Sequence, residues 1–223
     1  MVLFSGTPCQ IEGLNKYLDK PYNNLFTVDL ICRGVNSPLI YSDWLNSISK
    51  TIDKKSINFR DKTFGWQHFC ISFKMKRGLY TGKKASCFSR LFGMHLILRP
   101  ACYNCRFTSK TRVADITLGD FWGIDSFFPD MNDDLGVSCV LCNTEKGKNF
   151  FNKISNLCIY KTCEIDDYIP FQPALYKQVE KPFNRDVFWF DYTKYGFRHV
   201  IRKYVGMNII NRGMRFLRRM VNH

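Results

Sequence analysis

The sequence contains no long apolar run. Nowhere in its 223 residues is there the stretch of about 18 consecutive apolar residues that suggests a transmembrane helix. The opening segment, Met1–Gly6, lacks the charged start and extended apolar region of a secretion signal. Internal repeats and low-complexity segments are also absent. We therefore expect a cytoplasmic protein with one main domain, since 45% hydrophobic and 16% aromatic residues are enough for one sizeable core.

Acidic residues are missing from the last part of the chain, where basic residues carry more than half of the net charge of +14. After Tyr192 there are eight basic residues: Lys194, Arg198, Arg202, Lys203, Arg212, Arg215, Arg218 and Arg219. Apolar residues recur there at helical spacing, first Phe197, Val200, Ile201 and Tyr204, then Ile210, Met214, Leu217 and Val221. Such helices could contact an anionic membrane surface, an acidic partner or nucleic acid. We favour a terminal helix that packs on its own domain, and we do not expect a nucleic-acid partner.

The ten cysteines fall into two groups. In a reducing compartment they should stay thiols, bind metal or do redox chemistry instead of forming a disulfide framework. Six lie in strand-like or mixed stretches and are interpreted as ordinary thiols: Cys70, Cys87, Cys139, Cys142, Cys158 and Cys163. The other four have special local sequence: Cys9 in Gly6-Thr7-Pro8-Cys9-Gln10, Cys32 in Cys32-Arg33-Gly34, and the pair in Cys102-Tyr103-Asn104-Cys105. Four thiolates can bind one iron-sulfur cluster or one metal ion.

The first 48 residues predict a β-α-β-α unit. Val2-Leu3-Phe4 reads as a strand, and Thr7–Gln10 as a capping box with proline at the first helical position. Leu25–Ile31 is a second apolar strand, and Ser37-Pro38 starts a second helix. The two strands should be parallel, which places Cys9 and Cys32 at the carboxyl edge of one sheet, where open α/β folds bind ligands. The helix macrodipole should also favour a thiolate at Cys9.

Downstream, the pattern becomes mixed. We expect strands at Ile57–Lys62 and Phe69–Met75, a turn at Arg77-Gly78, and a helix over Phe88–Leu98. The spacing of Cys102 and Cys105 suits two ligands of one metal centre, but also a redox switch or half of a zinc site. A strand at Asp115–Gly119 leads into Gly119–Gly123, where glycines would allow close approach to a planar ligand or a phosphate, or form a tight turn beside the core. Further elements are predicted as a strand over Val137–Leu141 and a helix from about Lys146.

Pro8-Cys9-Gln10 also matches the nucleophile signature of cytosine-5 DNA methyltransferases. Those enzymes need a glycine-rich cofactor loop before the cysteine and a Glu-Asn-Val segment after it. Only Met1–Gly6 lies before this motif, and the sequence has no Glu-Asn-Val. We reject this interpretation because a motif without its structural context is weak.

Five blocks in a fixed order resemble a known family. They are Gly6-Thr7-Pro8-Cys9-Gln10, Leu25 through Cys32-Arg33-Gly34, Asn58–Lys62 with Gly65-Trp66, Arg99–Cys105, and Asp115–Gly123. Over roughly residues 1 to 145 the sequence is similar to the coenzyme F420 hydrogenase/dehydrogenase beta-subunit family, specifically its C-terminal domain. The remainder, including the basic tail, shows no family signal.

The resemblance implies an iron-sulfur flavoprotein that passes electrons between a reduced donor (coenzyme F420, ferredoxin or similar), a flavin and a [4Fe-4S] cluster. It implies Cys9, Cys32, Cys102 and Cys105 as the cluster ligands. The residues expected to line a site for FAD, another flavin or coenzyme F420 are Gly6, Thr7, Gly34, Arg60, Lys62, Gly119, Asp120 and Trp122. No catalytic residue is assigned.

Family members usually carry sequence before the Gly-Thr-Pro-Cys block, often a ferredoxin-like segment. We therefore expect a fragment, a truncated gene product, or a subunit that depends on an electron-transfer partner protein or ferredoxin. The expected fold is mixed α/β, with a parallel β-α-β-α start, a mixed sheet and a basic helical tail. Residues 1–170 would form the family domain, and residues 171–223 a basic extension with possible membrane-surface contact. Two alternatives stay open: a four-cysteine zinc-binding module, and a catalytically silent relic without flavin.

Overall fold

The computed structural model describes residues 1–48, 52–75 and 78–206, which form two compact units. The first unit joins Met1–Arg33 to Asn104–Val179, and the second joins the described residues of Gly34–Tyr103 to those from Glu180 to residue 206. The helix after residue 184 belongs to the second unit because it packs with segments before residue 103, and the division into a family domain over residues 1–170 and an extension stays a prediction. Segments that are so far apart in the sequence can pack together without any local change in composition. Such contacts therefore cannot be recognised from the sequence.

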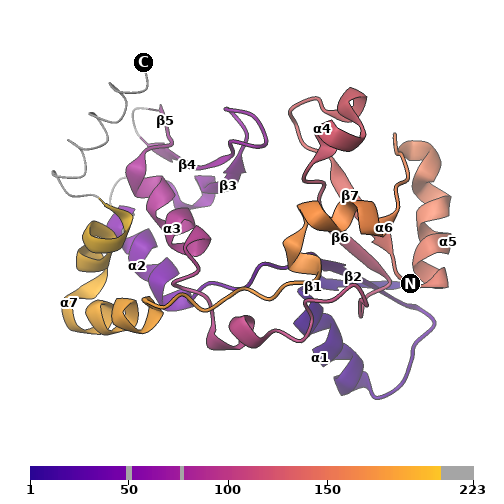
Figure 1. Cartoon of the computed structure of the whole chain (residues 1–223), viewed down its shortest axis with the longest axis horizontal. Coiled ribbons are helices and arrows are strands. Elements are labelled where there is room, and N and C mark those ends of the chain that lie inside the picture. The colour runs from indigo at the N-terminus through magenta and orange to yellow at the C-terminus, as the bar shows by residue number, and fades with distance from the viewer. Residues whose placement is uncertain (49–51, 76–77, 207–223) are drawn as a thin grey trace. The chain divides into compact units, whose positions relative to one another are not determined.

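The first unit is built on a mixed four-stranded sheet (Figure 1). Its strands are β1 (Val2–Gly6), β2 (Leu25–Leu30), β6 (Ile116–Asp120) and β7 (Ser138–Cys142), in the order β1-β2-β6-β7. The first three are parallel and β7 is antiparallel to β6, which confirms the parallel start and the mixed sheet. The helices of this unit are α1 (Pro8–Leu18), α4 (Ile124–Phe127), α5 (Glu145–Ile154) and α6 (Ile165–Tyr168).

The start of α1 follows from its local sequence. The predicted capping box at Thr7 forms, and the Gln10 side-chain oxygen accepts a hydrogen bond from the Thr7 N–H at 2.8 Å. Pro8 occupies the first helical position, where its missing N–H costs nothing. One apolar face then buries Ile11 against the sheet, as contacts of α1 with β1 and β2 show. The turn that carries Cys9 is therefore fixed by both capping and packing.

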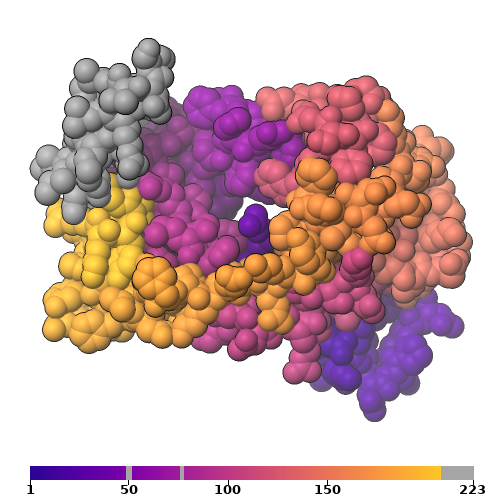
Figure 2. All heavy atoms as spheres, in the orientation of Figure 1, coloured from indigo at the N-terminus to yellow at the C-terminus, as the bar shows by residue number. Residues whose placement is uncertain are grey.

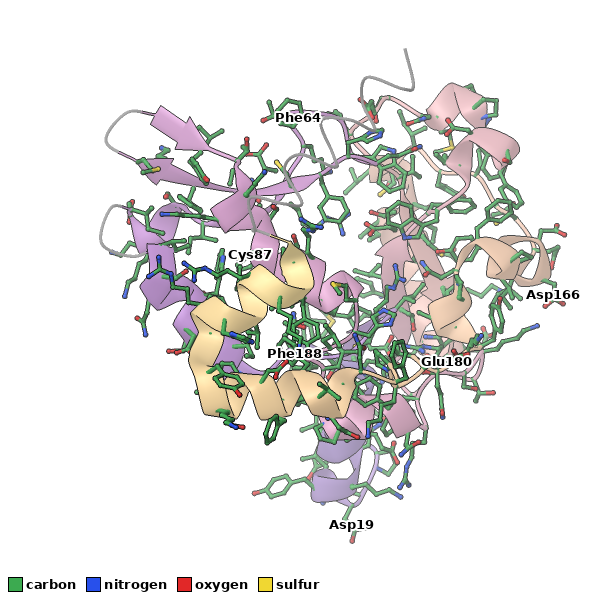
Figure 3. The ribbon with its side chains drawn as sticks, turned by 60° about the vertical axis from the view of Figure 1, so that its left-hand side comes forward. Asp19, Phe64, Cys87, Asp166, Glu180 and Phe188 are labelled. Atoms are coloured by element: carbon green, nitrogen blue, oxygen red, sulfur yellow. The ribbon has the colours of Figure 1, made fainter. Side chains whose placement is uncertain are left out.

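The second unit combines a small antiparallel sheet with three helices. The strands are β3 (Asn58–Asp61), β4 (Cys70–Met75) and β5 (Gly78–Tyr80), and the helices are α2 (Pro38–Ile48), α3 (Lys83–Gly93) and α7 (Arg185–Val205). Space-filling atoms of α7 lie directly against those of α3 in Figure 2. Cys87 of α3 and Phe188 of α7, both labelled in Figure 3, belong to one buried cluster with Trp44, Phe73 and Phe88. An aromatic and aliphatic core thus holds this unit together.

Short 3₁₀ helices connect the larger elements. They span Lys54–Ser56, Pro100–Asn104, Pro129–Met131, Ser155–Leu157, Ile169–Phe171 and Pro173–Leu175. Four of them have proline at their first or second position. The segment Pro100–Asn104 is the one that carries Cys102, so half of the predicted ligand pair lies in a tight helical turn.

The helix predicted over Phe88–Leu98 is displaced, because α3 runs from Lys83 to Gly93. Beyond it, His95 adopts a left-handed backbone (φ 58°), which an α-helix does not allow. Leu98 then forms an antiparallel bridge with Asn36, and Ser37 donates its N–H to the Ile97 carbonyl. The segment up to Leu98 is therefore not helical, although its apolar spacing suggested a helix, because it pairs with a segment some 60 residues earlier in the chain.

Helix α7 contains a sharp bend at Gly196, whose backbone (φ 78°, ψ 174°) is not helical. On either side of the bend, Phe188 and Val200 are both fully buried in the same core. Lys203 reaches back to Asp191 at 2.7 Å, which also requires the bend. The interpretation of the tail as a helix packed on its own domain is confirmed up to residue 205.

The second predicted stripe of the tail, Ile210 to Val221, lies outside the described residues. Among the residues that the structure describes, no helix combines the length and apolar character needed to cross a membrane.

Candidate functional site

Cys9 and Cys32 follow neighbouring parallel strands of the first unit, as the sequence predicts. In the register of β1 and β2, Gly6 pairs with Asp29. Cys9 lies three residues after Gly6, and Cys32 lies three residues after Asp29. The two cysteines therefore lie at the same edge of the sheet. This is the carboxyl edge, where open α/β sheets place their ligands.

The Cys9 thiol is exposed and has a polar neighbour. Its sulfur lies 3.1 Å from the Thr7 hydroxyl oxygen. Cys9 also occupies the first turn of α1, where unpaired N–H groups and the macrodipole stabilise negative charge. Both features suit a sulfur that ligates a metal, because a ligating sulfur carries negative charge.

The Cys102 thiol lies in the second unit, at the 3₁₀ turn Pro100–Asn104. Its sulfur accepts a hydrogen bond from the Val35 N–H at 3.4 Å. Gly34, the residue before Val35, has φ 106°. A Cβ at Gly34 would lie 3.0 Å from the Leu98 side chain and 3.5 Å from the Cys102 Cβ. Glycine is therefore needed next to Cys102 for both backbone conformation and space.

The four predicted ligands are divided between the units. Cys9, Cys32 and Cys105 belong to the first unit and Cys102 to the second, because the boundary falls between Tyr103 and Asn104. Within the described ranges, no three His, Cys, Asp or Glu side chains gather closely enough to hold a metal ion. The donor chemistry fits an anionic thiolate centre, and the convergence of all four thiols stays a prediction.

A buried ion pair joins the neighbourhoods of Cys32 and Cys105 inside the first unit. Arg112 Nη2 lies 2.9 Å from Asp29 Oδ2, and the two side chains are 2% and 0% exposed. The same guanidinium donates to the carbonyls of Leu30 at 3.2 Å and Phe107 at 3.1 Å. Leu30 precedes Cys32 by two residues, and Phe107 follows Cys105 by two. Arg112 therefore attaches the loop after one cysteine to the strand end before the other.

Two buried carboxyl groups of this sheet have pKa values shifted in opposite directions. Burial raises the pKa of Asp29, and the Thr117 hydrogen bond and the Arg112 charge offset this only in part. Burial also acts to raise the pKa of Asp115, but donors from Thr27, Thr144 and Lys146 outweigh it, so the pKa falls below its usual value. Asp115 is therefore a firmly ionised anchor, whereas the ionised form of Asp29 depends on its arginine.

The comparisons with known proteins identify the family. The family defined by the C terminus of the beta subunit of coenzyme F420 hydrogenase/dehydrogenase matches residues 1–168, three quarters of the chain. This chain belongs to that family. The match includes all four of Cys9, Cys32, Cys102 and Cys105, and it extends beyond the span of roughly 1 to 145 over which the sequence motifs carry the resemblance.

The solved structures that are similar to this chain include a hydrogenase subunit. A chain of the F420-reducing [NiFe] hydrogenase complex from Methanosarcina barkeri, studied by xenon derivatization, is 18% identical with a TM-score of 0.44. The alignment covers 91% of this chain and 60% of that one, so the present chain spans about three fifths of the length of this relative. No curated protein matches the sequence significantly.

The residues expected to line a flavin site in this family member lie in both units. Gly6, Thr7, Gly119, Asp120 and Trp122 are in the first unit, and Gly34, Arg60 and Lys62 are in the second. Asp120 ends β6 beside β2, so it shares the carboxyl edge with Cys9 and Cys32. A Cβ on Gly119 would lie 2.5 Å from Ile31, which explains this glycine by packing. The flavin assignment stays a prediction.

Arg60 and Lys62 are the two basic residues expected to face phosphates or carboxylates of a cofactor. Arg60 lies on β3, and its guanidinium stacks on the Phe69 ring at 4.4 Å. Lys62 directly follows β3. Both therefore belong to the small sheet of the second unit, whereas Cys9 belongs to the first unit.

Two of the remaining cysteines are buried thiols. Burial raises the pKa of Cys87 and that of Cys139 to about 11. Burial also raises the pKa values of Cys70, Cys142 and Cys163. Protonated thiols are poor ligands and poor nucleophiles at neutral pH, in agreement with their interpretation as ordinary thiols.

Sequence reasoning missed the Asp29–Arg112 pair and the donor at Val35. A signal for the first exists, because Asp29 is an acid inside the apolar strand Leu25–Leu30, and a charge buried there needs a partner. Nothing in the sequence identifies Arg112 as that partner, since 83 positions separate the two residues. The backbone N–H of Val35 has no sequence signature at all.

Proposed function

We propose that this protein is an electron-transfer oxidoreductase module that holds a [4Fe-4S] cluster through Cys9, Cys32, Cys102 and Cys105 and works with a flavin. The observation that carries this proposal is the family match over residues 1–168, which contains all four cysteines in their motifs. The common sheet edge of Cys9 and Cys32 supports it independently. A bound cluster would supply one-electron chemistry.

The chain's own residues would bind and tune the cluster. Thiolates of the four cysteines would ligate iron, with the Thr7 hydroxyl and the Val35 N–H close to two of the sulfurs. Hydrogen bonds to ligand sulfurs raise the reduction potential of such a centre. The positive end of α1 acts in the same direction, because it favours the more negatively charged reduced state.

The family match supports the proposed electron donor and acceptor, and no site in the structure is used to choose them. We propose coenzyme F420, ferredoxin or a similar reduced donor, FAD or another flavin beside the cluster, and a partner protein that completes the electron path. Their contacts would fall on the carboxyl edge of the parallel sheet, near Gly6, Thr7 and Asp120.

Anaerobic purification of the full chain, followed by reconstitution with iron and sulfide, tests the cluster. We expect iron and acid-labile sulfide in equal amounts, about four of each per chain for a [4Fe-4S] centre, and broad absorption that bleaches on reduction. Protein with neither iron nor sulfide would refute the proposal. Colourless protein with bound zinc would favour the zinc module, and denaturation that releases no flavin would remove the flavin from the proposal.

Replacement of single cysteines tests the ligand set. Cys9→Ser should lower the affinity for iron by at least the roughly 10-fold loss that is typical of changes beside a metal ligand. Cys158→Ser is the matched control, because Cys158 is exposed and has no assigned role. Iron content and sulfide content per chain are the measurements. Equal loss in both variants would contradict the ligand assignment.

A further inference from the structure

The segment that follows the family match touches both ends of the Cys102-x-x-Cys105 turn. The match stops at residue 168, yet Gln178 and Arg185 each donate hydrogen bonds to residues of this turn. The two residues lie seven positions apart and reach different residues of the motif. Residues outside the family match thus contact a cysteine motif that lies inside it.

In the second unit, Arg185 holds Tyr103, the residue directly after Cys102. Its Nε donates to the Tyr103 hydroxyl at 2.9 Å, and its guanidinium stacks on the Tyr103 ring at 5.1 Å. Its Nη2 donates to the Leu98 carbonyl at 3.1 Å. The Arg185 side chain is only 12% exposed, and Tyr103 is buried. A buried, charge-assisted contact of this kind is stronger than a surface one.

The rest of α7 and the Tyr103 hydroxyl secure the segment that precedes the turn. Trp189 Nε1 donates to the Leu96 carbonyl at 3.1 Å, and the Tyr103 hydroxyl donates to the His95 carbonyl. Three carbonyls between residues 95 and 98 are therefore satisfied by side chains. The same stretch pairs with residues 35–37, which bring the Val35 N–H to the Cys102 sulfur. The first turn of α7 therefore contacts the segment that positions Cys102.

In the first unit, Gln178 holds the other end of the motif. Its Nε2 donates to the Cys105 carbonyl at 2.8 Å. This hydrogen bond fixes the backbone of Cys105, one of the predicted cluster ligands, directly. It is separate from the Arg112 contact to Phe107, which lies two residues further along.

We propose that Gln178 and Arg185 are positioning residues that hold the Cys102–Cys105 turn in the geometry needed for ligation. The segment beyond the family match would then be part of the working site. The expected effect on cluster binding rests on the proposed function. The effect on the position of the turn can be measured without iron.

The test uses the full chain, first without iron. Arg185→Met keeps an aliphatic side chain and removes the donors, and Arg198→Met is its control at an exposed position of the same helix. The measurement is the alkylation rate of Cys102 by iodoacetamide, from peptide mass spectrometry, with Cys158 as internal reference. We expect an increase of about fivefold for Arg185→Met, the factor that one net hydrogen bond contributes, and none for the control.

Tyr103→Phe provides a second variant in case Arg185→Met does not fold. It keeps the buried ring and removes only the hydroxyl that Arg185 contacts, and we expect the same direction of change. For the other anchor, Gln178→Leu should raise the alkylation rate of Cys105. Lys181→Leu is its control, because the ion pair of Lys181 with Asp186 is solvent-exposed.

The second measurement is the rate of iron loss to a chelator after reconstitution. We expect iron loss to be faster by roughly 10-fold in Arg185→Met, as for other residues that orient metal ligands. Unchanged alkylation and unchanged iron loss in all three variants would overturn the inference, as would equal changes in variants and controls. Wild-type protein that binds no iron, with faster alkylation in the variants, would refute the cluster and leave the positioning role supported.

Discussion

The two units differ in the proportion of polar side chains that they bury. The second unit has a core of aromatic and aliphatic side chains, in which Trp44 and Phe88 stack with ring centroids 5.2 Å apart. The first unit buries polar residues within its parallel sheet, with Asp29 and Thr117 linked to each other and Asp115 bonded to Thr27. Hydrophobic burial stabilises without direction, whereas buried hydrogen bonds demand specific partners.

This difference separates two tasks within one chain. The buried polar residues of the first unit's sheet lie on β2, which leads to Cys32, and on or directly before the neighbouring strand β6, so their directional bonds fix these two strands. The apolar core of the second unit holds α7 in place, and through α7 the contacts to Tyr103. Apolar contacts therefore stabilise the second unit, and hydrogen bonds position β2 and β6 of the first unit. Mutations can change one kind of contact without the other.

The largest effect is expected from a cavity in the second unit. Trp44→Ala removes a fully buried side chain and leaves the Lys84 carbonyl without its donor, so the free energy of unfolding should fall by about 3–5 kcal/mol. Urea denaturation measures this, and hydrogen exchange should show lost protection in α2 and α3 but not in β2 and β6. Phe183→Ala, at a side chain that is 97% exposed, is the control. Equal loss of protection in β2 and β6 would contradict the view of two separate cores.

A smaller but more specific effect is expected in the first unit. Arg112→Met leaves the Asp29 carboxyl buried without its partner, so the free energy of unfolding should fall by about 3 kcal/mol. Adding Asp29→Leu to this variant should restore part of the loss, because no buried charge then remains. Lys146→Met, which removes the partly exposed partner of Asp115, should cost at most about 1 kcal/mol. Equal losses for Arg112→Met and Lys146→Met would show that burial does not decide the strength of these pairs.

The smallest effect, and the one with the clearest sign, is the pH dependence of the two carboxyl groups. The pKa of Asp115 is lowered from its usual 3.8, so its contribution to stability is present above that pH and is lost as the pH falls through the lowered value. The pKa of Asp29 is raised, so its contribution is present below 3.8 and is lost as the pH rises through the raised value.

Stability curves against pH for Asp115→Asn and Asp29→Asn test this. The stability difference between wild type and Asp115→Asn should shrink as the pH falls below about 4, the range of an ordinary carboxyl group. For Asp29→Asn, wild type should lose stability relative to the variant as the pH rises from about 4. Curves with the same slope for both variants would contradict the opposite pKa directions.

Elements with local signals could be predicted from the sequence. The capping box at Thr7, proline at position 8 and the apolar strand from Leu25 are all short-range patterns, and the β-α-β-α start follows from them. The placement of Cys9 and Cys32 at one sheet edge needs only the rule that such strands are parallel.

Features that depend on distant pairing could not be predicted. The end of α3 is set by the pairing of Leu98 with Asn36, which the helical spacing of apolar residues conceals. The division into two units depends on α7 packing with segments more than 80 residues earlier. The partners of the Cys102–Cys105 turn, Gln178 and Arg185, share no motif with it.

The bend at Gly196 has a practical consequence for work with this chain. Because it folds α7 back on itself, side chains on both sides of the bend, from Phe188 to Val205, complete one core. A shortened chain that stops at residue 168, where the family match ends, would leave the apolar faces of α2 and α3 uncovered in solvent. Such a protein is expected to aggregate during expression, so the smallest usable recombinant form must include residue 205.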